Sequence, residues 1–303
     1  MSEFVYEATK TKELIASTML ADQGASFRQW SARVLPHIED AYRGADAPFR
    51  THLGASMIGR ECAREIWYGF RWVKKPKFDG RMLRLFNRGH LEEGRFIALL
   101  LMIGMQVFQQ DANGHQFRIS EAGGHFGGSG DGIGVSCPDL PAGSYCLCEF
   151  KTHGEKSFNK LKSDGLRSSK PEHYIQMQIY MTKMGYQYGL YIAVNKNTDE
   201  LECLIVVNDG VTGLEYINRG VDIIFTTQAP SKICKSATMF KCKFCDFKEI
   251  CHYGADVEVN CRTCQYSNPH QDGTWRCNLN NDAVLLKEQQ LVGCPNYQRW
   301  DEL

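Results

Sequence analysis

The chain has 303 residues, of which 43% are hydrophobic and 23% are charged. These values are typical of a soluble globular protein with room for one large domain and a smaller one. Thirty-five Lys and Arg balance 35 Asp and Glu, so the formal net charge of 0 excludes a strong overall attraction to polyanions. Any affinity for nucleic acid must therefore come from local clusters of positive charge.

The sequence contains no pattern that predicts membrane insertion. Residues 1–12 lack the apolar core of a signal peptide, and the longest apolar run, 96–108, is too short to cross a bilayer. We therefore expect a cytoplasmic protein without a membrane partner, in the host cytoplasm if a phage encodes it. In such a reducing compartment, clusters among the thirteen cysteines are better explained as metal ligands than as disulfides.

The first third of the chain shows helical periodicity, and residues 1–52 are expected to form a helical N-terminal region. The predicted helices cover residues 12–20, 27–42, 54–68 and 79–104. The last of them carries His90 and Glu93, which are three residues apart and can share one face of the helix.

The middle of the chain, residues 53–228, predicts an α/β core. Strands are expected over 106–110, 116–121, 132–136, 145–152, 186–194 and 201–207. A polar, lysine-containing loop follows the fourth of these strands, and helices are expected over 171–185 and 213–226. We expect the strand over 145–152 to lie at the centre of the sheet.

That strand carries the residues with the clearest chemistry. Glu149 and Lys151 are two apart, so a strand points both side chains to one face. Asp131 closes a glycine-rich segment upstream and could reach the same face through a hairpin. Two converging carboxylates repel each other unless a hard cation such as Mg²⁺ or Mn²⁺ lies between them, and the lysine could orient a metal-activated water. This set predicts phosphodiester cleavage, while a solvated strand face is the simpler alternative.

Beyond residue 228 the cysteines become dense, and residues 229–257 form a first metal-binding segment. Cys242, Cys245 and Cys251 have the spacing C-x₂-C-x₅-C and need a fourth ligand. Cys62 and Cys234 compete for that place, and Cys234 requires the shorter loop closure. Four thiolates suit an iron–sulfur cluster or structural zinc equally well.

Residues 258–303 contain a second tetrad, composed of Cys261, Cys264, Cys277 and Cys294. The C-x₂-C opening and the two later cysteines predict a zinc-ribbon-like knuckle, with His270 as a possible substitute ligand. So short a segment has little core, and zinc would supply its folding free energy. The remaining strand cysteines are expected to be core residues: Cys137, Cys146, Cys148 and Cys203.

With these motifs placed, the chain resembles the PD-(D/E)XK nuclease superfamily, and more closely its RecB-like branch. That branch includes the CRISPR-associated iron–sulfur exonucleases and the phage recombination exonucleases. The resemblance spans about residues 56–251 and rests on motifs in the family order. They are residues 60–68 with Cys62, residues 89–93, Asp131, residues 149–151, Gln176 with Tyr180, and the trio Cys242, Cys245 and Cys251.

The resemblance implies a restriction-endonuclease-like core with a mixed central sheet flanked by helices. Asp131, Glu149 and the backbone carbonyl of Phe150 would hold Mg²⁺ or Mn²⁺, and Glu93 or His90 would complete the site. The resemblance also implies roles for two residues of the helix over 171–185. Gln176 would orient Lys151 or the DNA backbone, and Tyr180 would pack beneath Gln176 or contact phosphate. It further implies that Cys62 closes a [4Fe–4S] cluster, with Cys234 as the runner-up. For Gln176 and Tyr180, an ordinary buried contact is the competing interpretation.

The function implied is that of a metal-dependent DNA exonuclease in recombination, repair or phage DNA processing. Its expected partners are single-stranded DNA or DNA ends and, by analogy, a recombinase or a single-strand-binding protein. Two alternatives use the same fold: a non-catalytic DNA-binding or adaptor protein, and a restriction-type endonuclease. The second cysteine tetrad lies outside the family pattern.

Overall fold

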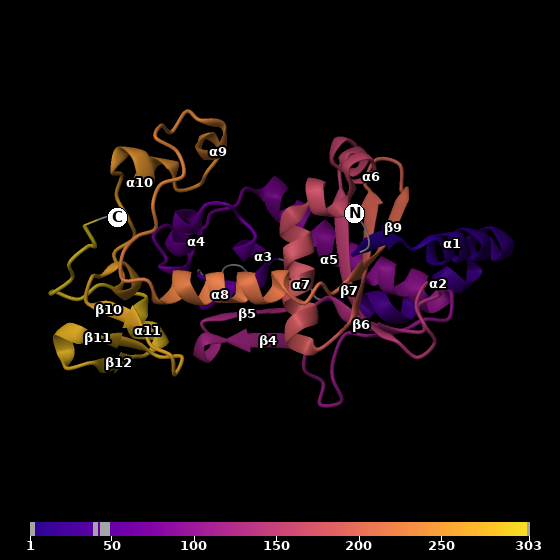
Figure 1. The fold of residues 1–303 in the computed structure, drawn as a ribbon, viewed down its shortest axis with the longest axis horizontal. Coiled ribbons are helices and arrows are strands. Elements are labelled where there is room, and N and C mark those ends of the chain that lie inside the picture. The colour runs from indigo at the N-terminus through magenta and orange to yellow at the C-terminus, as the bar shows by residue number, and fades with distance from the viewer. Residues whose placement is uncertain (1–3, 39–41, 43–48, 302–303) are drawn as a thin grey trace. The chain divides into compact units, whose positions relative to one another are not determined.

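The computed structural model describes residues 4–38, 42 and 49–301, which form two compact units (Figure 1). Unit 1 consists of Met1–Asp46, Phe78–Ile119 and Ser129–Leu214. Unit 2 consists of Ala47–Lys77, Ser120–Gly128 and Glu215–Leu303. Each unit is thus assembled from three separate stretches of chain. The boundaries expected near residues 52, 228 and 257 do not coincide with this division.

Unit 1 contains a six-stranded mixed sheet in the order β1-β9-β8-β7-β6-β3. The strands are β1 Val5–Glu7, β3 Gln106–Phe108, β6 Gly132–Val135, β7 Tyr145–His153, β8 Tyr188–Asn195 and β9 Leu201–Val207. Strands β7 and β8 pair in parallel, whereas the other neighbouring strands pair antiparallel. Because β7 has two strands on one side and three on the other, the expectation of a central acidic strand is confirmed.

Helices flank this sheet on both faces (Figure 1). They are α1 Thr9–Asp22, α2 Ala25–Val34, α5 Gly80–Met102, α6 Glu155–Ser169 and α7 Pro171–Met184, and a 3₁₀ turn, η1, covers Leu35–His37. On one face, Phe96 of α5 stacks on Phe150 of β7 with ring centroids 5.2 Å apart, inside the main hydrophobic cluster. On the other face, α7 supplies His173, whose ring is bonded to Tyr191 of β8. Because successive side chains of β7 point to opposite faces of the sheet, one face of the strand is apolar and the other is polar.

Most sequence predictions for unit 1 are confirmed, and the exceptions have clear physical reasons. The helix predicted over 27–42 already ends at Val34, because Pro36 lacks the amide that an α-helix needs there; residues 39–41 and 43–48 lie outside the described residues. Residues 5–7, placed in the helical region, form β1, which pairs with β9. The polar loop predicted after β7 is wrong, since α6 forms there and buries Phe158, Leu161 and Leu166.

The expectation that strand cysteines fill the core is confirmed. Cys137, Cys146, Cys148 and Cys203 all belong to the hydrophobic cluster of unit 1. A thiol is small and weakly polar, so it packs between strand and helix without needing a strong hydrogen bond.

Unit 2 combines short helices with two small sheets. Its helices are α3 Ala55–Ile58, α4 Ala63–Phe70, α8 Thr212–Phe225, α9 Phe240–Lys243, α10 Lys248–Tyr253 and α11 Lys287–Gln290. One sheet has the order β2-β5-β4, and its strands are Leu53–Gly54, Phe126–Ser129 and Arg118–Glu121. The other has the order β10-β11-β12, and its strands are Ser267–Pro269, Trp275–Cys277 and Ala283–Leu285. The 3₁₀ turns η3, η4 and η5 cover Ala122–Gly124, Cys261–Thr263 and Asn278–Asn280. Strand β5 escaped prediction because its Gly-rich sequence is typical of a loop.

Two buried arginines attach the C-terminal residues of unit 2 to the end of α4. The guanidinium of Arg71 lies 4.5 Å from the ring centre of Trp300, and that of Arg262 lies 3.7 Å from the ring centre of Trp72. Arg262 also donates to the carbonyl of Phe70 at 3.1 Å. Burial lowers the pKa of Arg71 to about 9, and the aromatic faces offset part of the cost of removing both cations from water.

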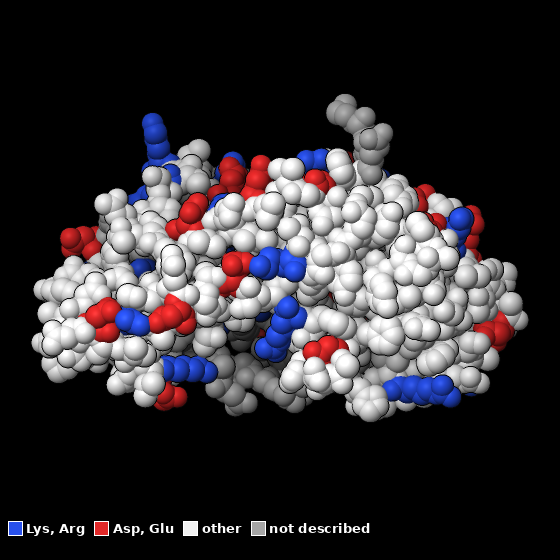
Figure 2. All heavy atoms as spheres, turned by 60° about the horizontal axis from the view of Figure 1, so that its bottom comes forward, with Lys and Arg blue, Asp and Glu red and all other residues white. Residues whose placement is uncertain are grey.

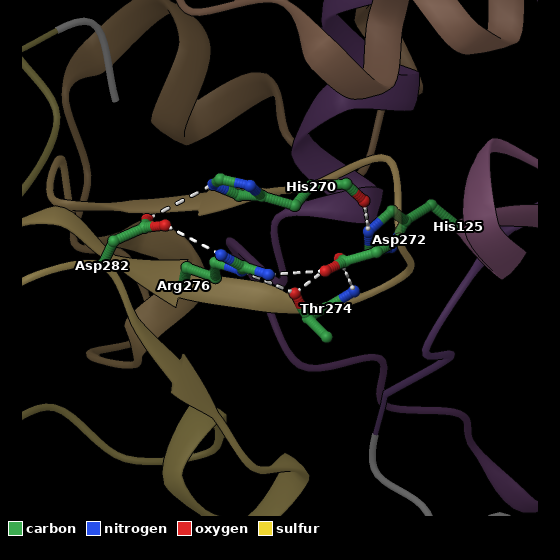
Figure 3. Close-up of polar contacts among 6 residues, drawn as sticks. All are labelled: His125, His270, Asp272, Thr274, Arg276 and Asp282. Carbon is green, nitrogen blue, oxygen red and sulfur yellow. Dashed lines mark hydrogen bonds and ion pairs between the residues drawn. The ribbon is translucent and has the colours of Figure 1, made fainter.

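Polar side chains of the β10–β12 sheet and of the turns beside it form a network of hydrogen bonds and ion pairs (Figure 3). Arg276 lies between two carboxylates, donating to Asp272 Oδ2 at 2.6 Å and to Asp282 Oδ2 at 2.9 Å. The carbonyl of His270 is 3.0 Å from Nε2 of His125, which joins this sheet to the segment before β5. These contacts link the turn between β10 and β11 to β12 and to the segment before β5.

Charged side chains are scattered over the surface shown in Figure 2, with both signs interspersed among uncharged residues. This distribution agrees with a formal net charge of 0. Among the helices in the described part of the chain, none has the length and apolar character needed to cross a membrane.

Candidate active site

The hairpin between β6 and β7 brings Asp131 next to the acidic strand. Gly132 pairs with Cys148 in the antiparallel register, so Asp131 lies beside Glu149. The Oδ2 atom of Asp131 accepts a hydrogen bond of 2.8 Å from the backbone amide of Phe150. This bond fixes the Asp131 carboxylate close to the strand residues Glu149 and Lys151, which precede and follow Phe150.

Glu149 and Lys151 form an ion pair through Oε1 and Nζ. The Glu149 side chain is completely buried, whereas a quarter of the Lys151 side chain is exposed. The second oxygen of Glu149, Oε2, is buried and has no hydrogen-bond partner. A buried carboxylate oxygen without a partner is uncommon and indicates a position where a ligand binds.

Glu93 joins these groups from α5. Burial, together with the nearby charges of Asp131 and Glu149, raises its pKa to about 8, and Lys151 opposes the shift. His90, one turn earlier on the helix, is exposed. Both line the same cavity, but Glu93 is the residue that the structure places among the carboxylates.

Three carboxylates therefore face a single ammonium. Burial raises the pKa of Glu149 to about 7, and repulsion by Asp131 contributes to the same shift. A further positive charge at the site would offset the repulsion that contributes to both raised pKa values, those of Glu93 and Glu149. Carboxylate oxygens are the preferred ligands of Mg²⁺ and Mn²⁺, so the donor set and the unpartnered Glu149 oxygen fit a hard divalent cation.

Gln176 and Tyr180 lie one turn apart on α7 and are both buried. Burial raises the pKa of the Tyr180 hydroxyl, and the charges of Glu149 and Asp131 add to that shift, while a hydrogen bond with Gln176 opposes it. The structure thus places Tyr180 near the carboxylates, with Gln176 bonded to its hydroxyl.

A second polar chain on the same face of the sheet was missed by the sequence analysis. The hydroxyl of Tyr191 lies 3.0 Å from Nε2 of His153 and 3.0 Å from Nδ1 of His173. Burial lowers the pKa of His153 to about 4 and that of His173 to about 3, so both rings are neutral at pH 7. His153 could have been found from its spacing of two from Lys151, but the partnership with Tyr191 depends on the register of β8.

A cavity of about 520 Å³ lies beside this group of residues. Glu93, Phe150 and Lys151 line it, together with Leu85 and Phe86 from the exposed N-terminal half of α5. A cavity of this size accommodates a small ligand or part of a larger one.

The four cysteines of the first predicted site line one cavity in unit 2. Cys62 is the N-cap of α4, where its sulfur accepts from the amide of Glu65, and Cys242, Cys245 and Cys251 come from α9, α10 and the turn between them. The rings of Tyr68 and Phe247 are in contact at 5.5 Å and hold the two stretches together. Cys234 is buried beside Cys242 but does not line this cavity.

The second tetrad is also gathered within unit 2. Burial raises the pKa of Cys261 to about 11, and the neighbouring thiols of Cys264, Cys294 and Cys277 contribute to the shift. His270, considered as a substitute ligand, lies instead 3.5 Å from Asp282 (Figure 3). Within the described residues, no group of three or more His, Cys, Asp or Glu side chains already has the close arrangement of a formed metal site.

No protein-family model and no curated protein matches the sequence. Among solved structures, that of SSO0001 is 15% identical with a TM-score of 0.41, and the match covers 77% of this chain and 96% of that chain. An alkaline exonuclease from Laribacter hongkongensis is 16% identical with a TM-score of 0.40, covering 65% of this chain and 90% of its own; its complex with dAMP gives the same values. At these TM-scores the likeness carries no argument about activity.

Proposed function

We propose that this chain is a metal-dependent deoxyribonuclease of the PD-(D/E)XK superfamily, in its RecB-like branch, and that it degrades DNA from ends. One observation carries the proposal. The amide of Phe150 holds Asp131 beside Glu149 and Lys151, and Glu149 keeps one buried oxygen without a partner. Structural ion pairs rarely leave a buried carboxylate oxygen unsatisfied, whereas a cation-binding site does so by design.

Each residue has a defined task in this proposal. Asp131 and Glu149 would hold Mg²⁺ or Mn²⁺ together with the carbonyl of Phe150, and Glu93 would complete the ligand set. When bound, such a cation would lower the pKa of a water molecule and neutralise charge on the scissile phosphate. Lys151 stabilises the negative charge that develops on the phosphate as the water oxygen bonds to phosphorus and the bond to the leaving oxygen breaks.

The test compares DNA substrates with and without ends. Linear, end-labelled DNA and covalently closed circular DNA are incubated with the protein and Mg²⁺ or Mn²⁺, and products are followed over time. We expect small products from the linear DNA only. Asp131→Asn should abolish cleavage, whereas Asp164→Asn, which changes an exposed aspartate on α6, should not.

The same experiment separates the two alternative functions. Cleavage of the circular DNA would favour an endonuclease of the restriction type. Binding of DNA without any product would favour a non-catalytic DNA-binding protein. Full activity in well-folded Asp131→Asn protein would overturn the assigned site.

We also propose that Cys62, Cys242, Cys245 and Cys251 hold a [4Fe–4S] cluster and that the second tetrad holds zinc. The shared cavity of the first four thiols supports the cluster, and the proximity of the other four supports the zinc site. Protein purified without oxygen should contain iron, sulfide and zinc and absorb visible light. Cys245→Ser should lose iron but keep zinc, and Cys264→Ser should do the reverse. Iron-free, colourless protein prepared in this way would contradict the cluster.

A further inference from the structure

Residues 231–245, here called the basic aromatic segment, expose two phenylalanine rings. Phe240 is 84% exposed and Phe244 is 76% exposed, more than any other phenylalanine, tyrosine or tryptophan among the described residues. Their ring centroids are 6.5 Å apart and the ring planes are nearly perpendicular. Leaving two large apolar rings in water is unfavourable, so their position needs an explanation.

The two rings are exposed although the segment is in contact with the rest of unit 2. Cys234, Ala237 and Cys242 face inward and are buried, and Lys241 pairs with Glu61. Directly after the segment, Phe247 packs on Tyr68. The backbone is therefore held in place, and the two rings are on its outward side.

The segment is also rich in lysine. Lys232, Lys235, Lys241 and Lys243 are all exposed, and the sequence from residue 229 to residue 245 contains no aspartate or glutamate. Lys241 is paired with Glu61, and Lys232 and Lys241 line the cavity of the four thiols. The ammonium of Lys243 lies 5.4 Å from the ring centre of Phe244, so an exposed ring and an exposed ammonium lie side by side in a chain whose formal net charge is 0.

We propose that the basic aromatic segment binds single-stranded nucleic acid, with Phe240 and Phe244 stacking on bases and the lysines contacting phosphates. The charge of the segment matches a polyanion, and each base of a single strand offers a free π-face. A duplex keeps its bases stacked inside and offers none to these rings.

An anionic membrane fits the surface less well. Membrane-surface helices need a continuous apolar face, but α9 has four residues and lysines interrupt its exposed rings. The inference concerns binding alone and does not depend on the cleavage proposed above.

The test uses the full chain carrying Asp131→Asn, without added divalent cations, so that no DNA is degraded during the measurement. Binding of a fluorescent oligothymidylate is measured by anisotropy for Phe240→Ala/Phe244→Ala and for the matched pair Leu279→Ala/Leu286→Ala, which removes exposed apolar side chains elsewhere in unit 2. At about 1–3 kcal/mol per stacked base, the first pair should weaken binding at least about tenfold. The second pair should not change it.

Three further measurements define the role of the segment. Phe240→Trp/Phe244→Trp should retain binding, because larger rings also stack. Lys235→Ala/Lys243→Ala should weaken binding and make it less sensitive to salt, because fewer counterions are released from the nucleic acid. A duplex of the same length should bind more weakly than the single strand.

Equal affinities for the phenylalanine-to-alanine pair and the parent protein would overturn the proposal, as would a preference for the duplex. Phosphatidylserine vesicles provide the membrane comparison: if that pair reduces vesicle binding but leaves oligonucleotide binding intact, the surface is a membrane contact. Iron and zinc contents and the circular dichroism spectrum, matched to the parent, show that the variants are folded. If the protein with Asp131 intact binds the oligonucleotide through these rings but cleaves no DNA in the presence of Mg²⁺ or Mn²⁺, the nuclease is refuted and this inference stands.

Discussion

At the scale of single residues, the candidate active site has more negatively than positively charged side chains. Glu93, Asp131 and Glu149 share one buried region with Lys151, and their mutual repulsion adds to the cost of burial. A site built only for stability would replace one of the carboxylates by an amide. Keeping all three is consistent with a cation that binds there and offsets the repulsion.

This repulsion predicts a pH dependence of stability in protein freed of divalent cations. The pKa of Glu93 rises from 4.5 to about 8 in the folded protein. The stability contributed by its proton is complete below pH 4.5 and is lost as the pH rises towards 8, because the unfolded chain releases that proton more easily. Urea unfolding should therefore show a steeper loss of stability between pH 5 and 8 for the parent than for Glu93→Gln. If the free energies of unfolding of the parent and of Glu93→Gln changed equally with pH, the raised pKa of Glu93 would be contradicted.

The hydrogen-bonded side chains of His153, Tyr191 and His173 predict that removal of the Tyr191 hydroxyl lowers the stability of the protein. Tyr191→Phe removes the hydroxyl that lies 3.0 Å from one nitrogen of each ring, so the buried His153 and the half-buried His173 both lose this partner. The free energy of unfolding should fall by about 1–3 kcal/mol. Tyr145→Phe, which changes an exposed ring, should alter it by less than about 0.5 kcal/mol. Equal effects of the two changes in urea unfolding would show that the network contributes nothing.

At the scale of elements, α5 serves two purposes along its length. Its C-terminal half buries Phe96, Ile97 and Leu100 against the sheet, while its N-terminal half leaves Leu85 and Phe86 exposed at the cavity. Asp79 starts the helix by accepting a 2.7 Å hydrogen bond from the amide of Met82. One helix therefore holds the half-buried Glu93 near the other carboxylates and lines the cavity beside them.

Two glycines of α5 predict opposite responses to the same substitution. A Cβ atom at Gly89 meets no atom within 4 Å, so Gly89→Ala should raise the free energy of unfolding by roughly 0.5–1 kcal/mol through helix propensity. At Gly94 a Cβ atom would lie 2.8 Å from Cγ1 of Ile38 and 3.0 Å from Cδ2 of Leu35. Gly94→Ala should therefore give no gain or a loss. Thermal or urea unfolding checks both, and an equal gain at the two positions would contradict the described packing.

At the scale of the whole molecule, the two units depend on different sources of stability. Unit 1 has a six-stranded sheet with a large hydrophobic cluster, whereas unit 2 relies on small sheets, buried arginines and two groups of thiols. Unit 2 contains Trp67, Trp72, Trp275 and Trp300, and Trp30 belongs to unit 1. Tryptophan fluorescence therefore reports mainly on unit 2.

This distribution predicts how metal removal affects the protein. Cys264→Ser should lower the midpoint of thermal unfolding followed by tryptophan fluorescence, because metal binding supplies folding free energy to the C-terminal residues. A strong chelator should lower the midpoint of the parent protein and reduce the difference between parent and variant. If the difference persists unchanged in the chelator, the effect comes from packing of the Cys264 side chain, and the second tetrad holds no metal.

Local patterns in the sequence were sufficient for several features of this protein. The spacing of Glu149 and Lys151 places them on one face, because alternation is a property of every strand. The cap at Asp79 and the proline that opens α7 mark helix ends through local backbone chemistry. Clusters of cysteine at short spacing likewise indicated where thiols gather.

Other features depended on contacts between segments that are distant in sequence. Glu93 rather than His90 joins the carboxylates because the rotation of α5 against the sheet decides which residue turns inward. Strand β1 is too short for a recognisable pattern and forms because β9 offers it a partner. Tyr191 meets His153 only through the parallel register of β7 and β8. The sequence by itself determined which residues share a face of one element; tertiary packing decided which faces meet, since that choice is made by side chains many residues apart.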